Sequence, residues 1–373
     1  MGSVLGRLRG WGGVSAMGAA CAACAVTATL VLVPLAHHGT GAADVRAGAP
    51  AADRATDAAA RRTSGVAAAP GQEQRCSSTG QPAEASVPAS DAGGPDIDKM
   101  LARKGDKRRL VVGVDQNSYQ WGYLNPATDQ FEGFDIDLAH AIAKNIFGDA
   151  NAVTFKPVST AERTEALANG SVDIVVRTMT IACNRLADAD FSTAYFKAGQ
   201  QVLAPKGDAT TITGYDATLR HKRVCTATGS TAVQELEKSN PYQVYFWDKA
   251  NNKGYNPEHK DVDDLSVANQ LDCLVRLQLG LVDAVITDNA LAAAQAAQDP
   301  AVELKGDAPF TTEYYGVAAK PHADDLVARI NAVLEQYRSG GAGSPWQKSY
   351  DKWLKAELGP TAGPPAPLYL TGH

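Results

Sequence analysis

Residues 133–144 read Gly133-Phe134-Asp135-Ile136-Asp137-Leu138-Ala139-His140-Ala141-Ile142-Ala143-Lys144. Apolar residues recur there at helical spacing, and the period continues to Ile146, which predicts a helix with one apolar face. Asp135 and Asp137 fall in its first turn, where carboxylates accept free backbone N–H groups and suit the positive end of the helix dipole. Taken alone, this pattern is also explained by an ordinary capped helix.

The segments around this helix alternate between strand and helix patterns. Short apolar runs at 110–114, 153–158 and 172–176 suit buried parallel strands. A capping box at Ser159–Glu162 begins a helix between the last two of them. The alternation restarts after residue 205, with strands at 223–227 and 282–287 and a helix over 266–279. This order predicts two α/β units with parallel strands.

A second motif follows the third strand, where residues 177–185 read Arg177-Thr178-Met179-Thr180-Ile181-Ala182-Cys183-Asn184-Arg185. With the Gly-aromatic-Asp-aliphatic-Asp-aliphatic pattern at 133–138, it makes the chain resemble bacterial solute-binding proteins of family 3, the polar amino-acid receptors of ABC importers. The resemblance covers about 108–358 and is closest to actinobacterial glutamate- and glutamine-binding members. It implies an α/β fold of the two-lobe periplasmic-binding-protein-like type (type II), with a central ligand cleft and two crossing hinge strands.

The boundaries of the parts follow from this resemblance and from composition. Lobe 1 is expected at 96–205 and again at 311–358, with lobe 2 at 206–310. Residues 44–95 are rich in Ala, Pro and Gly and hold too little apolar area to offset the entropy of ordering, which predicts a disordered tether. The Pro-rich end, 359–373, is expected to be a loosely packed tail.

The N-terminus is typical of an exported protein. Arg7 and Arg9 precede an apolar run over about 14–36, and small residues follow, so residues 1–43 are expected to be a signal peptide. The run is also long enough to span a bilayer, so an uncleaved membrane anchor is an equal alternative. Lipidation at Cys21 or Cys24 is a third. Each alternative places the rest of the chain outside the cytoplasm, associated with the cell envelope or secreted.

Composition excludes several classes of protein. The 373 residues carry a formal net charge of −6 and no basic stripe, so nucleic acid is not an expected partner. Histidines are scattered and show no close Cys/His spacing, so no metal or other cofactor is expected. We expect a monomer.

The resemblance assigns a recognition role to several residues. Arg185 matches the arginine that clamps the ligand's α-carboxylate, as its planar fork suits that group. Thr178 and Thr180 match nearby hydroxyl or backbone contacts. In lobe 2, Ser230 and Thr231 open a helix whose free N–H groups can hold the same carboxylate. Asp288, at a strand end, matches the partner of the α-ammonium, with a role as helix cap as the alternative.

Two further arginines concern the ligand's side chain. Arg163 matches an arginine that holds the side-chain carboxylate in glutamate- and aspartate-binding relatives, and a solvated helix arginine is the alternative. Arg177 adds a second cation nearby. Asp115 departs from those relatives, which can carry a cleft arginine there, so acid and amide ligands both stay open. Tyr119 or Trp121 is expected to form an aromatic wall over the ligand, with core packing as an equal alternative.

Four cysteines lie in the exported part, and an even count in an oxidising compartment predicts two disulfides out of three pairings. Cys225 and Cys273 share lobe 2, which favours that pair. The pairing of Cys76 with Cys183 follows by exclusion and would tie the tether to the body.

These observations predict an amino-acid-binding protein that serves the permease and ATPase of an ABC importer. The resemblance favours glutamate or aspartate, with glutamine and asparagine left open. One alternative is a sensing module that reports its ligand to a kinase system. Another is an enzyme related to cyclohexadienyl dehydratases, in which Asp115 or Glu162 would be the general acid.

Overall fold

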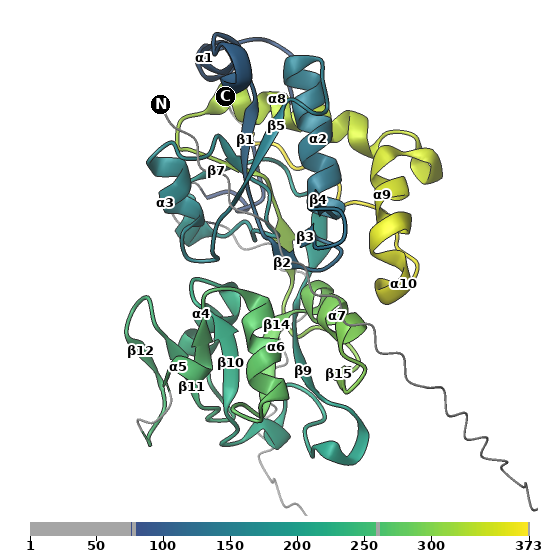
Figure 1. The fold of residues 1–373 in the computed structure, drawn as a ribbon. Helices are drawn as coiled ribbons and strands as arrows, with labels where there is room; N and C mark the ends of the chain where they lie inside the picture. Colours follow the sequence, from purple (N-terminus) through teal and green to yellow (C-terminus); the bar gives the residue numbers. More distant parts are fainter. Residues whose placement is uncertain (1–75, 77–79, 259–261, 372–373) are drawn as a thin grey trace, which may run out of the picture. The chain divides into compact units, whose positions relative to one another are not determined.

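The computed structural model of the chain describes residues 76, 80–258 and 262–371. The predicted signal peptide or anchor (1–43) lies outside the described residues. So does the predicted tether up to residue 79, apart from Cys76. The described part is organised by two five-stranded sheets, which we call the sheets of lobe 1 and lobe 2 (Figure 1).

The sheet of lobe 1 has the order β5-β1-β6-β17-β7. Its strands are β1 (Leu110–Val114), β5 (Val153–Pro157), β6 (Ile174–Val175), β7 (Asp190–Phe191) and β17 (Ala318–Ala319). β1 runs parallel to β5 and β6, as the β-α-β order requires, whereas β17 joins antiparallel. Val112 and Val111 point into different apolar clusters on the two faces of the sheet. Both faces are therefore covered, and the strand is apolar throughout.

The sheet of lobe 2 repeats this plan with the order β13-β10-β14-β9-β15. Its strands are β9 (Gln200–Pro205), β10 (Val224–Ala227), β13 (Ser266–Val267), β14 (Ala284–Asp288) and β15 (Val302–Lys305). β10 lies parallel to β13 and β14, and β9 runs antiparallel to β14 and β15. Residues 200–205 thus belong to the second sheet, although the sequence placed them in lobe 1. The antiparallel register was not visible in the apolar pattern of β9.

The chain crosses between the sheets twice. On the way out, β8 (Phe196–Ala198) leads through Gly199 into β9; on the return, β16 (Glu313–Tyr315) leads to β17. β8 and β16 pair antiparallel, so the two crossings lie side by side. A side chain at Gly199 would collide with the carbonyl oxygen of Thr311, which explains the glycine.

Helices cover both sheets. Those of lobe 1 are α1 (Pro95–Leu101), α2 (Phe134–Phe147), α3 (Arg163–Ala168), α8 (Asp324–Arg338), α9 (Pro345–Trp353) and α10 (Lys355–Leu358). Those of lobe 2 are α4 (Thr231–Lys238), α5 (Val262–Leu265), α6 (Gln270–Gln278) and α7 (Asn289–Gln298). The late helix α8 packs against the early helices α1 and α2 (Figure 1).

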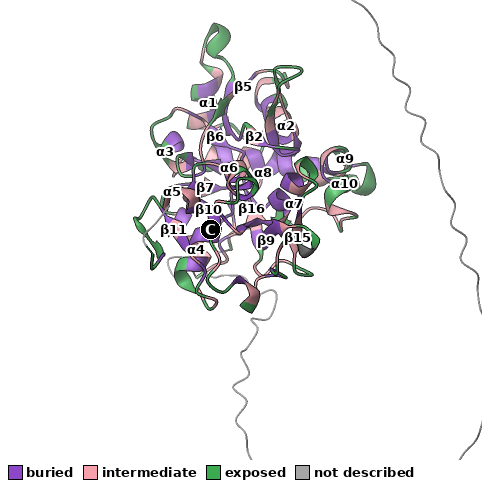
Figure 2. Cartoon of the chain, turned by 60° about the horizontal axis from the view of Figure 1, so that its bottom comes forward, coloured by how far each residue is buried: buried purple, intermediate pink, exposed green. Residues whose placement is uncertain are grey.

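Two details differ from the expected helices. The helix predicted over 266–279 begins only at Gln270, because Ser266 and Val267 pair with β10 as strand β13. Smaller sheets are formed by β2 (Asn117–Ser118), β3 (Gly122–Asn125) and β4 (Gln130–Glu132), and by β11 (Phe246–Asp248) and β12 (Lys253–Tyr255). In Figure 2 the strands of both main sheets are largely buried, and exposed residues lie on the outer helices and loops.

The segment at 80–94 is ordered against lobe 1, unlike the disordered tether expected there. Ser86 exchanges backbone hydrogen bonds with Leu368 and Leu370 of the C-terminal segment, at 3.0 and 2.8 Å. Its Oγ donates to the carbonyl oxygen of Phe191 at 2.6 Å. Asn331, fully buried on α8, donates to Ser86 Oγ and to the carbonyl oxygen of Val87. Backbone hydrogen bonding, which composition does not reveal, thus fixes both this segment and the predicted loose tail.

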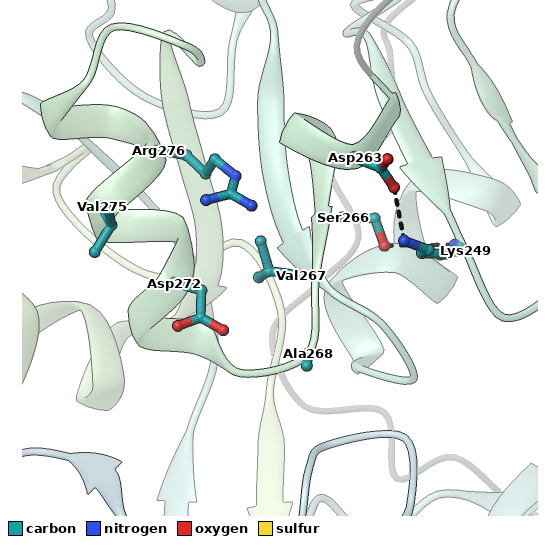
Figure 3. Close-up of a pocket in the computed structure, with 8 residues that line it drawn as sticks. All are labelled: Lys249, Asp263, Ser266, Val267, Ala268, Asp272, Val275 and Arg276. Carbon is teal, nitrogen blue, oxygen red and sulfur yellow. Dashed lines mark hydrogen bonds and ion pairs between the residues drawn. The ribbon is translucent and has the colours of Figure 1, made fainter.

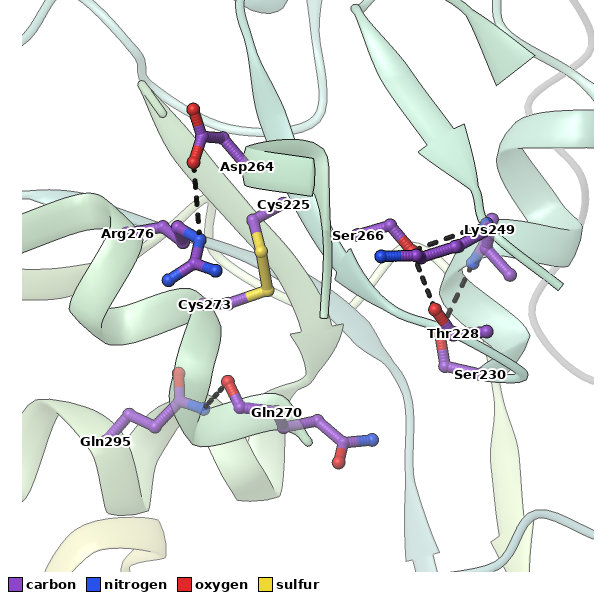
Figure 4. The surroundings of a disulfide bond; sticks show 11 residues. Cys225, Thr228, Ser230, Lys249, Asp264, Ser266, Gln270, Cys273, Arg276 and Gln295 are labelled. Atoms are coloured by element: carbon purple, nitrogen blue, oxygen red, sulfur yellow. Dashed lines mark hydrogen bonds and ion pairs between the residues drawn. A yellow bond between two sulfur atoms is a disulfide. The ribbon is translucent and has the colours of Figure 1, made fainter. Parts of the chain in front are cut away.

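The structure contains two disulfides. Cys225 of β10 is bonded to Cys273 of α6, and thus links the second sheet to a covering helix (Figure 4). Cys76 is bonded to Cys183, which lies at the start of the 3₁₀ turn Cys183–Arg185. Both disulfides agree with the pairing predicted from the sequence, in which Cys225–Cys273 was favoured and Cys76–Cys183 followed by exclusion.

We predict that Cys225→Ser/Cys273→Ser lowers the free energy of unfolding by about 4 kcal/mol, because the link removes entropy from the unfolded chain. The two cysteines are separated by 48 residues. Guanidinium denaturation of this variant beside wild type measures the change. The variant Cys76→Ser/Cys183→Ser separates the effects of the two links. Equal midpoints for wild type and the Cys225/Cys273 variant would contradict the prediction.

Candidate functional site

The loop 177–185, which we call the ligand loop, leaves the end of β6 in an unusual conformation. Thr178 has a φ of +42°, a region that a β-branched residue rarely adopts. Its backbone N–H donates a hydrogen bond of 3.0 Å to Asp135 Oδ2. Tyr195 donates its hydroxyl to the other oxygen, Oδ1, at 2.8 Å. Asp135 therefore holds the start of the ligand loop.

This role of Asp135 differs from the helix cap expected from the sequence. α2 is capped at Gly133 without a side-chain hydrogen bond, and Asp137 instead accepts from Ser349 and Trp353. Burial raises the pKa of Asp135 to about 7, although Tyr195 and the Thr178 N–H partly oppose that shift. The carboxylate of the sequence motif thus acts across the lobe and not on its own helix.

Arg177 is neutralised within the protein. Its Nη2 lies 2.7 Å from Asp115 Oδ2, and both side chains are almost fully buried. Arg177 also donates to Thr160 Oγ1 at 3.0 Å and to Asn269 Oδ1, in lobe 2, at 3.2 Å. Its charge is therefore compensated by Asp115.

Arg163 and Arg185, which we call the arginine pair, have a different environment. They are 4% and 7% exposed, which excludes the solvated arginine considered for Arg163. Arg163 begins α3 and donates to the carbonyl oxygens of Thr160 (2.8 Å) and Gly229 (3.3 Å). Arg185 donates to the carbonyl oxygens of Thr180 (2.6 Å) and Gly229 (3.0 Å).

The arginine pair has no carboxylate at ion-pair distance within the described part of the chain. Burial lowers the pKa of Arg163 strongly, and the nearby charges of Arg185 and Arg177 add to this. Burial likewise lowers the pKa of Arg185, although the charges of Glu313 and Asp288 oppose that shift. Two buried cations that share one neutral carbonyl oxygen make a site suited to an anion.

Lobe 2 approaches this pair at the turn that contains Gly229. Gly229 has a φ of +75°, and a Cβ there would lie 3.0 Å from the Cα of Ala161 in lobe 1. Ser230 caps α4 by accepting from the Val233 N–H, and it is buried, as is Thr231. The turn at Gly229 therefore lies against the segment just before α3, the helix that Arg163 begins.

Asp288 ends β14 and is 6% exposed. Its side chain makes no cap bond to α7, which argues against the capping alternative. It accepts hydrogen bonds from Tyr315 Oη and from Gln200 Nε2. Burial raises the pKa of Asp288, and the charge of Glu313 raises it further, while Tyr315, Arg185 and Arg163 oppose the rise.

Glu313 and Gln200 were not identified from the sequence. Glu313 begins β16, and Gln200 begins β9 directly after the outward crossing; they are almost fully buried, at 5% and 1% exposure. The only sequence signal was polar residues at the start of strands that are otherwise apolar or aromatic. Burial raises the pKa of Glu313, and its polar neighbours together with the charge of Arg185 oppose that rise.

The two candidate aromatic residues lie in other surroundings. Trp121 is fully buried in the core, where its ring packs against Phe134 and Phe196, and its Nε1 donates to Ala290. Tyr119 is exposed and packs edge-on against Tyr123. Core packing, which the sequence left open, therefore describes Trp121.

A separate open pocket of about 350 Å³ lies beside α6 in lobe 2 (Figure 3). It is lined by Lys249, Asp263, Ser266, Val267, Ala268, Asp272, Val275 and Arg276, none of which is a candidate ligand residue. Within residues 76, 80–258 and 262–371, no group of acidic, His and Cys side chains could hold a metal ion. Over the same residues, no helix combines the length and apolar character needed to cross a membrane.

Comparison with known proteins decides the family. The family model of bacterial extracellular solute-binding proteins, family 3, matches residues 110–356. The chain belongs to this family. The match spans both sheets and both crossings, and solved structures of similar proteins confirm the predicted two-lobe type II fold.

Individual members of family 3 are similar over most of their length. The ABC transporter glutamine-binding protein GlnH of Bacillus subtilis is 33% identical over 282 residues, which cover 76% of this chain and 92% of GlnH. The glutamate-binding protein GluB of Corynebacterium efficiens is 26% identical, over 67% of this chain and 79% of GluB. Among solved structures, an ancestral arginine-binding protein bound to glutamine is 32% identical, with a TM-score of 0.55, over 68% of this chain and 98% of that one.

We predict that Asp135→Asn changes how stability depends on pH. The pKa of Asp135 is raised from 3.8 to about 7 in the folded protein, so the folded state binds more protons than the unfolded state between these values. The stability contributed by this group is therefore complete below about pH 4 and is lost as the pH rises through 7. The variant, which cannot titrate there, should gain on wild type by on the order of 1–3 kcal/mol between pH 5 and pH 8.

Urea denaturation of both proteins at several pH values measures this difference. Other titrating groups are common to both proteins and cancel in the comparison. A difference in the free energy of unfolding that stays constant with pH would contradict the raised pKa of Asp135.

Proposed function

We propose that this chain is an extracytoplasmic receptor for an acidic amino acid, glutamate or aspartate, that delivers its ligand to an ABC importer. The observation that carries the proposal is the arginine pair, which is buried without a carboxylate partner in the described residues. Because burying a cation without an ion-pair partner is costly, the pair favours a ligand that brings carboxylates.

The charges of the site match the three groups of an amino acid. Arg185, on the ligand loop, is suited to the α-carboxylate, together with the helix start at Ser230 and Thr231. Asp288 is suited to the α-ammonium. Arg163 then remains for a carboxylate on the ligand's side chain. Arg177 is left out of this assignment because Asp115 already neutralises it at 2.7 Å.

Similarity supports the ligand class but leaves a choice within it. GlnH is named for glutamine and GluB for glutamate, and the two ligands share a backbone and a side-chain carbonyl. The second arginine without an ion pair favours the acid, since an amide brings no charge to a buried cation. We therefore place glutamate and aspartate before glutamine and asparagine.

An enzymatic function receives less support. Asp115, one proposed general acid, is ion-paired with Arg177, and Glu162, the other, is exposed and bonded to Ser159.

We infer that the protein binds its ligand and that the two lobes then close around it. We further propose that the N-terminal segment is a signal peptide or an anchor and that the protein acts as a monomer. Reporting to a kinase system would use the same site and would need a partner.

A thermal-shift screen of the exported part against all common amino acids tests the proposal directly. Glutamate or aspartate should raise the melting temperature most, because a ligand that binds only the folded state stabilises it. Calorimetry then ranks acids against amides. A chain that no amino acid stabilises, or one stabilised best by an apolar amino acid, would contradict the proposed function.

We predict that the two arginines have separable roles. Arg185→Ala should weaken every amino-acid ligand by roughly 2–5 kcal/mol, because a buried carboxylate loses its charged partner. Arg163→Met should weaken glutamate and aspartate much more than glutamine and asparagine. The quantity to measure is the ratio of acid and amide dissociation constants, since specificity is a difference of affinities.

The exposed Arg220 provides a control, and Arg220→Met should change neither dissociation constant. Equal losses for acid and amide in Arg163→Met, or no loss for either, would remove the side-chain role of Arg163.

A further inference from the structure

Two buried polar side chains at the crossings are not explained by the roles assigned so far. Gln200 opens β9 and Glu313 opens β16, so each lies where the chain passes between the two sheets. They are 1% and 5% exposed. A buried polar group that only connects strands would be expected to have all its hydrogen bonds made within the protein.

Gln200 has an acceptor without a donor. Its Nε2 donates to Asp288 Oδ1 and to Thr231 Oγ1, the latter at 3.0 Å. These two acceptors fix the orientation of the amide, because the reversed amide would set its oxygen against the carboxylate. In the described part of the chain, Gln200 Oε1 then has no hydrogen-bond donor although it is buried. An unsatisfied acceptor of this kind is costly unless a ligand supplies the donor.

Glu313 lies in the same cluster. Thr311 donates its hydroxyl to Glu313 Oε1 at 3.2 Å, and the nearby polar side chains of Thr180 and Gln200 lower the pKa of Glu313 against the effect of burial. Asp288 and Glu313, which we call the acidic pair, interact electrostatically with each other. Neither has an ion pair among the described residues. The other charged or titratable groups that face the pair are Arg185, Arg163 and Tyr315.

We propose that Gln200 and Glu313 complete, together with Asp288, a cage for the α-ammonium group of the ligand. An ammonium group has three N–H donors and no acceptor, and the cage offers a carboxylate from β14, a second carboxylate from β16 and an amide oxygen from β9. The inference rests on the proposed function, because it requires an amino-acid ligand. It adds Gln200 and Glu313 to the proposed ligand-binding residues, which otherwise come from the ligand loop, the start of α4 and the end of β14.

The cage has a consequence for protons. Burial, with the charge of the neighbouring carboxylate, raises the pKa of Asp288, and burial also raises that of Glu313. Near neutral pH the acidic pair therefore retains a proton for part of the time. An ammonium cation favours the doubly ionised pair, so its binding expels that proton to solvent, and affinity rises with pH through this range.

The test compares the preferred amino acid with its 2-hydroxy analogue, which carries a hydroxyl in place of the ammonium. For glutamate the analogue is 2-hydroxyglutarate. In Gln200→Leu and in Glu313→Gln, the preference for the amino acid over the analogue should fall about tenfold, because only the ammonium needs all three acceptors. Gln201→Leu is the matched control on the same strand. Its side chain bonds to the carbonyl oxygens of Lys305 and Gly306, so the preference should not change.

Calorimetry at pH 7 in phosphate and in Tris measures how many protons are released when the ligand binds, because the two buffers take up a proton with different enthalpies. Wild type should show a binding enthalpy that depends on the buffer, and this dependence should be smaller in Glu313→Gln, in which only Asp288 is left to release a proton. Equal losses for amino acid and analogue in both variants, or a wild-type enthalpy independent of buffer, would overturn the cage. If Glu313→Gln does not fold, the Gln200→Leu variant and the comparison of buffers with wild type still test the cage. A wild type that binds no amino acid would overturn the proposed function itself, whereas binding with an unchanged preference overturns only the cage.

Discussion

Buried charge without a partner is the constraint around which this molecule is arranged. The arginine pair contributes two cations from lobe 1, and the acidic pair contributes two carboxylates from the end of β14 and the start of β16. None of the four has an ion-pair partner in the described residues, although Arg177 and Asp115 close by satisfy each other at 2.7 Å. One charged pair is thus satisfied within the protein, and in the function that we propose the other two sets of opposite charge bind the charged groups of an amino acid.

The fold supports this arrangement by restricting the groups that carry it. Asp135 holds the N–H of Thr178 in a conformation that a β-branched residue rarely adopts, which fixes the start of the ligand loop. The disulfide of Cys183 to Cys76 holds the other end of the loop, two residues before Arg185. Gly199 allows the two crossings to approach each other, and this places Gln200 near Glu313. Rigid support of this kind keeps charged side chains in position without neutralising them.

Much of this was predictable because it depends on local pattern. Apolar runs and their order gave the two α/β units, and the motif at 177–185 led to Arg185. The role of Asp135 was missed because the sequence shows its place on α2 but not its bonds to the neighbouring elements. Gln200 and Glu313 were missed for the same reason, since each is a polar residue at the start of a strand and the two are 113 positions apart in the numbering. The order of residues 80–94 depends on hydrogen bonds to Leu368 and Asn331, which no local composition can indicate.

A crystal structure of the exported part with L-glutamate bound tests the central claim most directly. We predict that the α-carboxylate lies within hydrogen-bond distance of Arg185, the side-chain carboxylate within that distance of Arg163, and the ammonium within that distance of Asp288. Glutamate bound elsewhere on the protein, or bound in the cleft with both arginines turned away from its carboxylates, would contradict the claim that these buried charges await the ligand.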